Sequence, residues 1–186
     1  MLKSTILIAL GANLPSARYG TPAQTIEAAL AALDAHPAVR VRRRSRWFES
    51  APVPISDQPW YVNGVCLVDT DLSPRALLDV LHAIEADFGR VRSEKNAPRV
   101  LDLDLLAYDD FVTADDQDFD VPHPRMHERA FVLLPLRDVV PGWIHPRTGA
   151  TLDALIADLS DEQVIRAMEP EHGAQEPYFD DDLDDD

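Results

Sequence analysis

Apolar and polar residues alternate with the period of a β-strand in three parts of the chain. Ser4 to Leu10 is an apolar, β-branched run ended by Gly-Ala-Asn, and it predicts a buried strand. Tyr61 to Thr70 predicts a second, central strand. In Leu101 to Leu105 leucines alternate with aspartates, and successive side chains of a strand point to opposite faces. Asp102 and Asp104 are therefore predicted to share one face of a third strand.

Helical spacing appears between and after these strands. Thr21 is a predicted N-cap, followed by proline at the first helical position and by the glutamine of a capping box. Ser73 caps a second predicted helix, whose apolar stripe ends at a glycine. Met126 to Asp138 predicts a third helix, interrupted at its internal proline, Pro135, and Thr151 to Leu159 predicts a short fourth one.

The remaining segments predict less regular structure. Val39 to Phe48 is basic and is expected to form a strand exposed on one side. Glu49 to Pro59 contains three prolines and is expected to be an irregular loop. Tyr108 to Phe111 predicts a hairpin turn that leads into a short strand at Phe111 to Thr113.

The order strand, helix, strand, strand, helix, strand predicts an α+β fold of the ferredoxin-like split β-α-β kind. It has an antiparallel sheet with helices on one face, here with a helical C-terminal extension. The length of 186 residues fits a single domain. We expect this domain to cover residues 1–168, and residues 169–186 to form a disordered acidic tail.

Charge narrows the possible partners. The formal net charge is −16, but nine of the 33 acidic residues lie in the tail, so the folded part is only mildly acidic. Generic nucleic-acid binding through a basic surface is therefore not expected. Five arginines within Val39 to Phe48 leave two interpretations open, a nucleic-acid contact or a solvated edge strand protected by charge, and we favour the edge strand.

Cysteine content and hydropathy bear on the compartment. Cys66 is the single cysteine, so no internal disulfide can form, which is typical of a reducing cytosol. The apolar run at the N-terminus is shorter than the core of a typical signal peptide, and no segment approaches the roughly 20 apolar residues of a membrane span. We expect a soluble, cytoplasmic protein that binds no membrane and is a monomer.

A mixture of cations and anions surrounds the predicted strand that carries Asp102 and Asp104. The loop before it contains four cations: Arg90, Arg92, Lys95 and Arg99. Carboxylate oxygens suit magnesium, and guanidinium groups suit phosphate oxygens. The stretch is compatible with a half-buried strand whose polar face is merely solvated, but the added cations favour a polyphosphate held through magnesium.

Four further polar residues are candidate contacts. Asn63 interrupts an apolar strand and is either a structural tie to a loop or a reader of a ligand's hydrogen-bonding pattern. Glu85 lies beside an apolar helical stripe, near the arginine loop. His123 and Arg129 are candidate phosphate contacts, and we do not favour zinc binding by His123 with His127 because no matching cysteine cluster accompanies them.

Five stretches of the chain together resemble one family, the 6-hydroxymethyl-7,8-dihydropterin pyrophosphokinases of folate biosynthesis. The resemblance covers roughly residues 4–140 in order and spacing. Its motifs are LGAN at 10–13, DQPWYVN at 57–63, IE with GRVR within 84–92, PRVLDLDLL at 98–106 and VPHPRMHERAF at 121–131.

The resemblance implies an ATP-dependent enzyme with two magnesium ions and the substrates ATP and 6-hydroxymethyl-7,8-dihydropterin. It transfers pyrophosphate to the pterin hydroxymethyl oxygen and releases AMP. The family pattern implies a catalytic set of Arg90, Arg99, Asp102 and Asp104, of which the two aspartates ligate the metal. It implies nucleotide contacts at Glu85, Arg92, His123 and Arg129. It implies pterin contacts at Ser50, Val53, Tyr61, Asn63 and Phe131, with the pterin between Tyr61 and Phe131.

Two departures from the family pattern stand near these positions. Asn96-Ala97 replaces the usual Trp-Gly, so an aromatic residue that commonly covers the bound pterin is missing, and we expect weaker pterin retention. Asp118 and Asp120 stand where some members carry a basic or hydroxyl residue near the nucleotide.

Two other classes of protein would share part of this pattern. A ferredoxin-like sensor that binds a ligand without turnover has no need for Asp102 and Asp104 together with the arginines. A two-metal phosphohydrolase needs more carboxylate ligands and a base that activates water. The kinase interpretation is therefore preferred.

Overall fold

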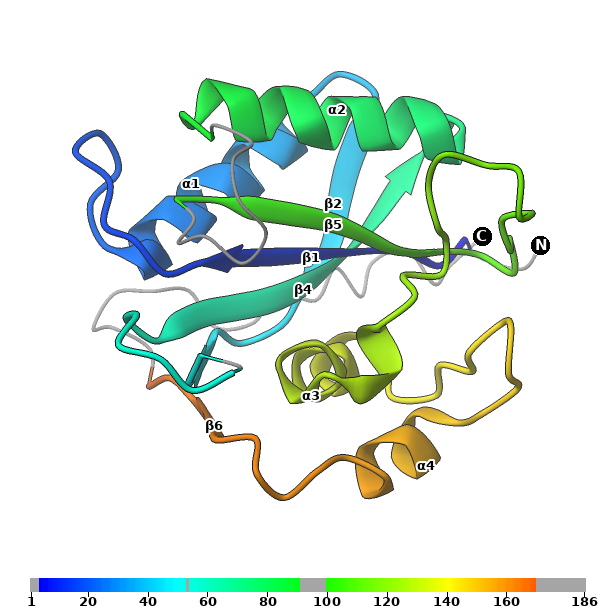
Figure 1. Ribbon diagram of the computed structural model, residues 1–186. Helices are drawn as coiled ribbons and strands as arrows, with labels where there is room; N and C mark the ends of the chain where they lie inside the picture. The colour runs from blue at the N-terminus through cyan, green and yellow to red at the C-terminus, as the bar shows by residue number, and fades with distance from the viewer. Residues whose placement is uncertain (1–3, 53, 91–99, 170–186) are drawn as a thin grey trace.

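The computed structural model of the protein describes residues 4–52, 54–90 and 100–169. Within them a six-stranded antiparallel sheet has the order β5-β1-β4-β3-β6, and β2 also pairs with β4 (Figure 1). The strands are β1 (Ile6–Ala12), β2 (Val39–Arg44), β3 (Phe48–Ser50), β4 (Tyr61–Thr70), β5 (Asp102–Tyr108) and β6 (Ile165–Ala167). The predicted antiparallel α+β fold is confirmed.

Helices cover both faces of this sheet. The helical segments are α1 (Pro22–Asp34), α2 (Pro74–Asp87), the 3-10 turn η1 (Met126–Glu128), α3 (Ala130–Val139) and α4 (Leu152–Ala157). Helices α1 and α2, which belong to the split β-α-β unit, lie together on one face, as predicted. The C-terminal extension lies on the other face, where α3 packs against the sheet and α4 packs against α3 (Figure 1).

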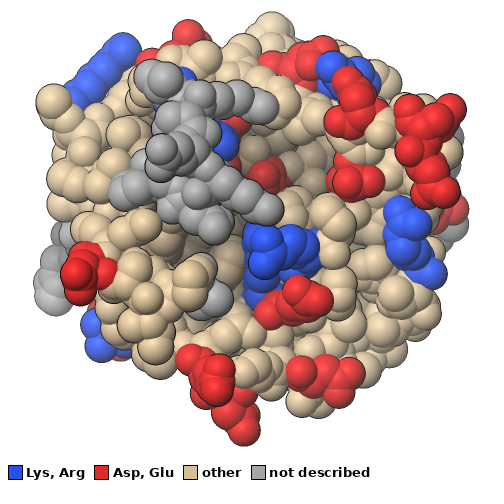
Figure 2. Space-filling view, in the orientation of Figure 1, with Lys and Arg blue, Asp and Glu red and all other residues tan. Residues whose placement is uncertain are grey.

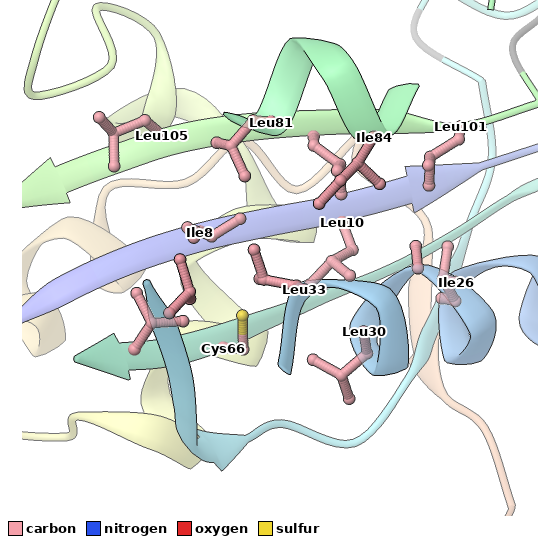
Figure 3. Close-up of a cluster of buried hydrophobic side chains, with 14 of the residues drawn as sticks. Ile8, Leu10, Ile26, Leu30, Leu33, Cys66, Leu81, Ile84, Leu101 and Leu105 are labelled. Carbon is pink, nitrogen blue, oxygen red and sulfur yellow. The ribbon is translucent and has the colours of Figure 1, made fainter. Parts of the chain in front are cut away.

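Alternation along the strands divides the core between these two layers. Ile8 and Leu10 of β1 point toward α1 and α2, where Leu81 of α2 and Leu33 of α1 meet them (Figure 3). Leu7, which precedes Ile8, points to the opposite face and belongs to the second cluster with α3. Burial of apolar side chains on both faces is the main force that holds the layers together.

Local sequence signals place the helices correctly. The Thr21 hydroxyl accepts a hydrogen bond from the Gln24 N–H at 3.2 Å, and the Gln24 side chain accepts one from the Thr21 N–H at 2.9 Å. Ser73 caps α2 by accepting from the Ala76 N–H at 3.2 Å. Gly89 follows α2 with φ +85°, a conformation that favours glycine. The predicted capping box and caps are confirmed.

The predicted strand from Val39 to Phe48 is wrong in its extent, because it divides into two strands. Ser45 still pairs with Val65, through backbone and side-chain hydrogen bonds of 2.9 Å each. The Trp47 ring then lies where a side chain on Gly64 would stand. This packing breaks the strand, and the chain resumes pairing as β3. The predicted loop from Glu49 to Pro59 therefore begins two residues too early.

Two other predictions are corrected in the second half of the chain. No strand forms at Phe111 to Thr113, because the backbone and hydroxyl of Thr113 bond instead to the backbone of Val121 within a loop. The third helix is not interrupted at Pro135, which lies inside α3. The break falls at Arg129, between η1 and α3, and burial of one face of α3 outweighs the hydrogen bond that proline removes.

Three of the five arginines of the basic segment pair with carboxylates. Arg42 pairs with Asp69 at 3.4 Å, Arg44 with Glu27 at 2.6 Å and Arg46 with Asp138 at 3.0 Å. On the face drawn in Figure 2, side chains of both signs are interspersed. These contacts favour the charge-protected strand over a nucleic-acid contact. In the described ranges, no helix is long and apolar enough to cross a membrane.

Candidate active site

A cavity of about 240 Å³ opens beside the ends of β1, β4 and β5, next to the start of α3. Strands, the loop after β3 and α3 all contribute to its lining. The lining residues are Ala9, Leu10, Gly11, Ser50, Ala51, Pro52, Pro54, Ser56, Gln58, Tyr61, Asn63, Asp102, Asp104, Arg129, Phe131 and Val132. Seven of the sequence-predicted site residues are thus brought together: Ser50, Tyr61, Asn63, Asp102, Asp104, Arg129 and Phe131.

Strand register explains how the floor of the cavity forms. Gly11 of β1 pairs with Asn63 on β4 and with Asp102 on β5, so these three residues form one row across the sheet. Ala9, two residues earlier on the same face, pairs with Asp104. On this face β1 presents the small residues Ala9 and Gly11 next to the polar side chains of β4 and β5, so space remains above it for a ligand.

Asn63 is bonded to Ser50 on one side and lies close to Gly11 on the other. Its side-chain N–H donates to Ser50 Oγ at 3.1 Å, and the residue is only 6% exposed. A Cβ on Gly11 would lie 2.6 Å from Asn63 Oδ1, closer than real side-chain contacts allow. The amide is thus both tied to a neighbour and part of the cavity lining, so the two roles considered for Asn63 are compatible.

A buried carboxylate, that of Glu85, positions an arginine next to the cavity residue Asp102. Glu85 of α2 is 2% exposed, and its carboxylate accepts from the Leu103 N–H at 3.0 Å and from the Arg90 guanidinium. Arg90 also donates to Asp102 Oδ1 at 2.8 Å. A buried carboxylate needs such partners to offset its desolvation. Glu85 therefore fixes Arg90 beside Asp102.

Arg129 and Phe131 enter the cavity from the start of α3. The Arg129 guanidinium lies 5.4 Å from the centre of the Phe131 ring, within the range of a cation–π contact. Burial and the nearby Arg125 lower the pKa of Arg129, while Asp104 and Asp102 act in the opposite direction. The guanidinium is a partly desolvated cation close to both carboxylates, a position suited to an anionic ligand.

His123 lies near this group but does not line the cavity. Burial, and next the charge of Arg129, lower the pKa of His123 to about 4. Its Nδ1 accepts from the Arg125 N–H at 3.2 Å, so in the neutral ring the proton is on Nε2. His123 is therefore a neutral hydrogen-bond donor at neutral pH. His127 instead packs edge-on against His145, with ring centroids 6.3 Å apart.

Several predicted site residues lie outside the described residues. They are Val53, Arg92 and Arg99, and the same holds for Lys95 and for the departure at Asn96-Ala97. Asp118, the other departure, pairs with Arg75 of α2 at 2.5 Å, and this contact lowers the pKa of Asp118.

Two residues outside the predicted site, Asn13 and Gln58, join the motifs to one another. Asn13 is fully buried, and its side-chain N–H groups donate to Gln58 Oε1 at 3.1 Å and to the Pro59 carbonyl at 3.3 Å. These contacts tie the LGAN segment to the proline-rich loop, of which Gln58 lines the cavity. The available signal was that Asn13 and Gln58 both lie within the recognised motifs.

The donor set at the cavity suits a hard divalent cation. Asp102 and Asp104 offer carboxylate oxygens from one face of β5, as magnesium and calcium prefer. Among residues 4–52, 54–90 and 100–169, no group of three or more His, Cys, Asp or Glu side chains is placed to hold a metal ion. Two carboxylates leave most coordination positions to a substrate and water, which is usual for magnesium with nucleotide phosphates.

An antiparallel α+β fold whose cavity combines paired carboxylates, an arginine and aromatic side chains is compatible with a phosphoryl-group transferase. Two curated relatives are similar over most of the chain. A 2-amino-4-hydroxy-6-hydroxymethyldihydropteridine pyrophosphokinase from Pseudomonas aeruginosa is 41% identical over 161 residues, which is 87% of this chain and 95% of the relative. One from Synechocystis sp. is 39% identical over 150 residues, 81% of this chain and 73% of the relative.

The family model for 7,8-dihydro-6-hydroxymethylpterin-pyrophosphokinase (HPPK) matches residues 7–141. The fold also matches solved structures, including the HPPK-DHPS protein of Plasmodium falciparum in complex with pteroate. The TM-score is 0.61 at 14% identity, over 83% of this chain and 42% of that chain. The chain spans less than half of that larger protein. This chain belongs to the 7,8-dihydro-6-hydroxymethylpterin-pyrophosphokinase family.

Family membership confirms the predicted reaction. The chain is an ATP-dependent pyrophosphokinase of folate biosynthesis, which transfers pyrophosphate from ATP to 6-hydroxymethyl-7,8-dihydropterin. The sensor and phosphohydrolase alternatives are thereby set aside.

Proposed function

We propose that the cavity holds the pterin next to the polyphosphate of ATP, and that Asp102 and Asp104 bind two magnesium ions between them. The single observation that supports this most strongly is the composition of the lining. Aromatic and amide groups suited to a flat heterocycle share one space of about 240 Å³ with the carboxylate pair. The two substrates must come together in this way for direct transfer.

The pterin end of the cavity selects its substrate by shape and hydrogen bonding. The pterin ring lies between Tyr61 and Phe131, and the Asn63 amide reads its donor and acceptor edge. Ser50 holds Asn63 through the bond of 3.1 Å, so the amide meets the ligand already oriented. Val53 contributes to the same wall in this proposal.

The phosphate end provides cations where negative charge accumulates. Arg90, oriented by Glu85, and Arg99 contact the transferring group, while Arg92, His123 and Arg129 contact ATP. Because its proton is on Nε2, neutral His123 donates a hydrogen bond to a phosphate oxygen. Fixed donors of this kind stabilise a phosphoryl transition state because they need no reorganisation during the reaction.

The reaction itself needs little covalent help from the protein. The pterin hydroxymethyl oxygen attacks the β-phosphorus of ATP and releases its proton to solvent, the bond from that phosphorus to the α,β-bridging oxygen breaks, and AMP leaves. When bound to Asp102 and Asp104, magnesium supplies charge neutralisation and alignment of the phosphate oxygens. The arginines hold the attacking and leaving groups in line.

We further propose that the catalytic domain covers residues 1–168, that the acidic tail takes no part in the chemistry, and that the enzyme is a cytoplasmic monomer. The single cysteine is free and buried, which suits a reducing compartment, and charged side chains along β2, such as Arg42 and Arg44 with their acidic partners, protect this strand against association with another chain. Light scattering of the purified chain at several concentrations tests the monomer.

The proposal predicts that removal of one metal ligand abolishes AMP formation. Asp102→Asn keeps the size of the side chain and removes its charge, while Asp110→Asn makes the same change at an exposed position outside the cavity. We expect pterin-dependent AMP release to fall by about 10³-fold or more in the first variant and to be unchanged in the second. Equal activity of both variants contradicts the assignment of Asp102.

A further inference from the structure

The C-terminal segment Gln163–Ala167 contacts two separate parts of the cavity lining. Its strand β6 pairs with β3, where Ile165 stands opposite Ser50. The Val164 carbonyl accepts a hydrogen bond from the Ala51 N–H at 3.0 Å. One end of this segment is therefore attached to the wall that includes Ser50 and Ala51.

Gln163 attaches the same segment to the start of α3. Its Oε1 accepts from the Ala130 N–H at 2.8 Å, and its Nε2 donates to the Glu128 carbonyl at 2.9 Å. These backbone groups belong to the residues on either side of Arg129. A single side-chain amide thus holds the main chain both before and after this arginine.

Among the described residues, the one side-chain acceptor recorded at the first N–H groups of α3 is that of Gln163. Arg129 occupies the N-cap position, with an extended backbone at φ −112° and ψ 111°, and its own side chain makes no capping hydrogen bond. The first N–H groups of a helix have no partners within the helix. Gln163 provides the acceptor that an arginine side chain, which only donates, cannot provide. The Arg129 guanidinium itself lines the cavity.

Arg129 and Phe131 depend on this backbone for their positions. Both line the cavity, and the Arg129 guanidinium carbon lies 5.4 Å from the centre of the Phe131 ring. If the peptide groups around Arg129 rotate, both side chains move, because they start from the same turn of chain. A displacement of about 1 Å at a binding group is enough to reduce catalysis substantially.

We propose that Gln163 is a positioning residue, which sets Arg129 and Phe131 for the two substrates although it does not itself line the cavity. This inference rests on the proposed function, in which Arg129 contacts ATP and Phe131 contacts the pterin. The β3–β6 pairing fixes the place of Gln163, so the C-terminal segment couples the two walls of the pocket.

The test replaces Gln163 by alanine and compares it with Glu162→Ala, a change at the exposed neighbouring residue. The measurements are the dissociation constant of 6-hydroxymethyl-7,8-dihydropterin in the presence of a non-hydrolysable ATP analogue, and kcat and KM for AMP formation. They are made well below the melting temperature of each variant. We expect the pterin dissociation constant to rise about tenfold in Gln163→Ala, because Phe131 is displaced from its binding position, and Glu162→Ala to match wild type.

A second variant separates positioning from folding. Gln163→Glu keeps an acceptor for the Ala130 N–H but loses the donor to the Glu128 carbonyl. We expect a melting temperature near that of wild type together with a rise of about threefold in the pterin dissociation constant. This variant also decides the question if Gln163→Ala does not fold.

The proposal is overturned if the Gln163 variants lower the melting temperature but leave the pterin dissociation constant and kcat/KM within twofold of wild type. Gln163 is then structural only. Failure of the proposed function has a different signature, because wild type itself then forms no AMP in response to the pterin.

Discussion

At the scale of single residues, the site depends on an absent side chain as much as on present ones. Gly11 lies between Asn63 and Asp102 in the sheet, and its missing Cβ leaves room for the Asn63 amide oxygen. The hydrogen bond from Asn63 to Ser50 limits how far this amide can move away. Gly11 is therefore required by its neighbour, and not by an unusual backbone conformation.

We predict that Gly11→Ala weakens pterin binding specifically. The added methyl group displaces Asn63 Oδ1 from the cavity, so we expect the pterin dissociation constant to rise about tenfold or more while ATP binding changes little. Fluorescence titration with each ligand measures both effects. Gly142→Ala is the matched control, because a Cβ there meets nothing within 4 Å. Unchanged pterin affinity in Gly11→Ala contradicts the role given to Asn63.

His123 makes stability depend on pH in a predictable direction. Its pKa is about 4 in the folded protein against 6.5 in the unfolded chain, so the unfolded chain binds more protons as the pH falls below 6.5. The contribution is fully present above pH 6.5 and is lost as the pH falls toward 4. Between pH 7 and pH 5 we expect the wild type to lose about 2 kcal/mol more unfolding free energy than His123→Asn.

Urea unfolding of both proteins at the two pH values measures this difference. Burial also lowers the pKa of His145, but His145 is present in both proteins and its contribution cancels. Parallel loss of stability in the two proteins is the result that contradicts a buried, neutral His123.

At the scale of helices and strands, local signals and alternation fixed most of the fold in advance. The capping box at Thr21 and the alternation of Asp102 and Asp104 with leucines each placed an element correctly. The errors arose where tertiary contacts decide. Trp47 packs onto Gly64 and divides the basic strand, and Thr113 bonds to Val121 in place of a strand partner. Neither contact can be predicted from the local spacing of apolar residues.

The predicted site divides in the same way. Residues on strands, such as Asn63 and Asp104, could be placed because alternation fixes the face they occupy. Gln163 could not be predicted as a site residue, because it lies outside all of the recognised motifs. Its contact partner Ala130 is 33 positions away in the sequence. The position of Glu85 near the arginine loop was anticipated, but its bond to the Leu103 N–H depends on how α2 packs against β5.

We predict that Thr21→Ala destabilises the protein by about 1 kcal/mol, because the first turn of α1 loses its capping acceptor. Thr21→Ser keeps the hydroxyl and is expected to remain within a few tenths of a kcal/mol of wild type. Chemical denaturation measures both changes. Equal destabilisation by the two substitutions is incompatible with a capping role for the hydroxyl.

At the scale of the whole molecule, the single cysteine, Cys66, is buried in the core and can report on global unfolding. Cys66 of β4 is fully buried in the core cluster that the sheet forms with α1 and α2, and burial raises the pKa of its thiol to about 12. Only the thiolate reacts readily with disulfide reagents. The native protein should therefore show no free thiol on the time scale of the assay, and one thiol per chain in denaturant.

We predict that labelling of Cys66 at pH 8 is at least about 10³-fold slower in native protein than in denaturant, because the reaction requires opening of the core. A variant that lowers global stability, such as Thr21→Ala, should accelerate labelling in proportion. Rapid labelling of native protein is inconsistent with the packing of β4 between the two helical layers.

The most direct measurement of the central claim is the balance of products formed from ATP, magnesium and 6-hydroxymethyl-7,8-dihydropterin. The account predicts one AMP for each pterin diphosphate, with both products lost together in Asp102→Asn and in Asp104→Asn. ADP with a pterin monophosphate, or AMP formed without the pterin, would contradict direct pyrophosphoryl transfer within a shared cavity.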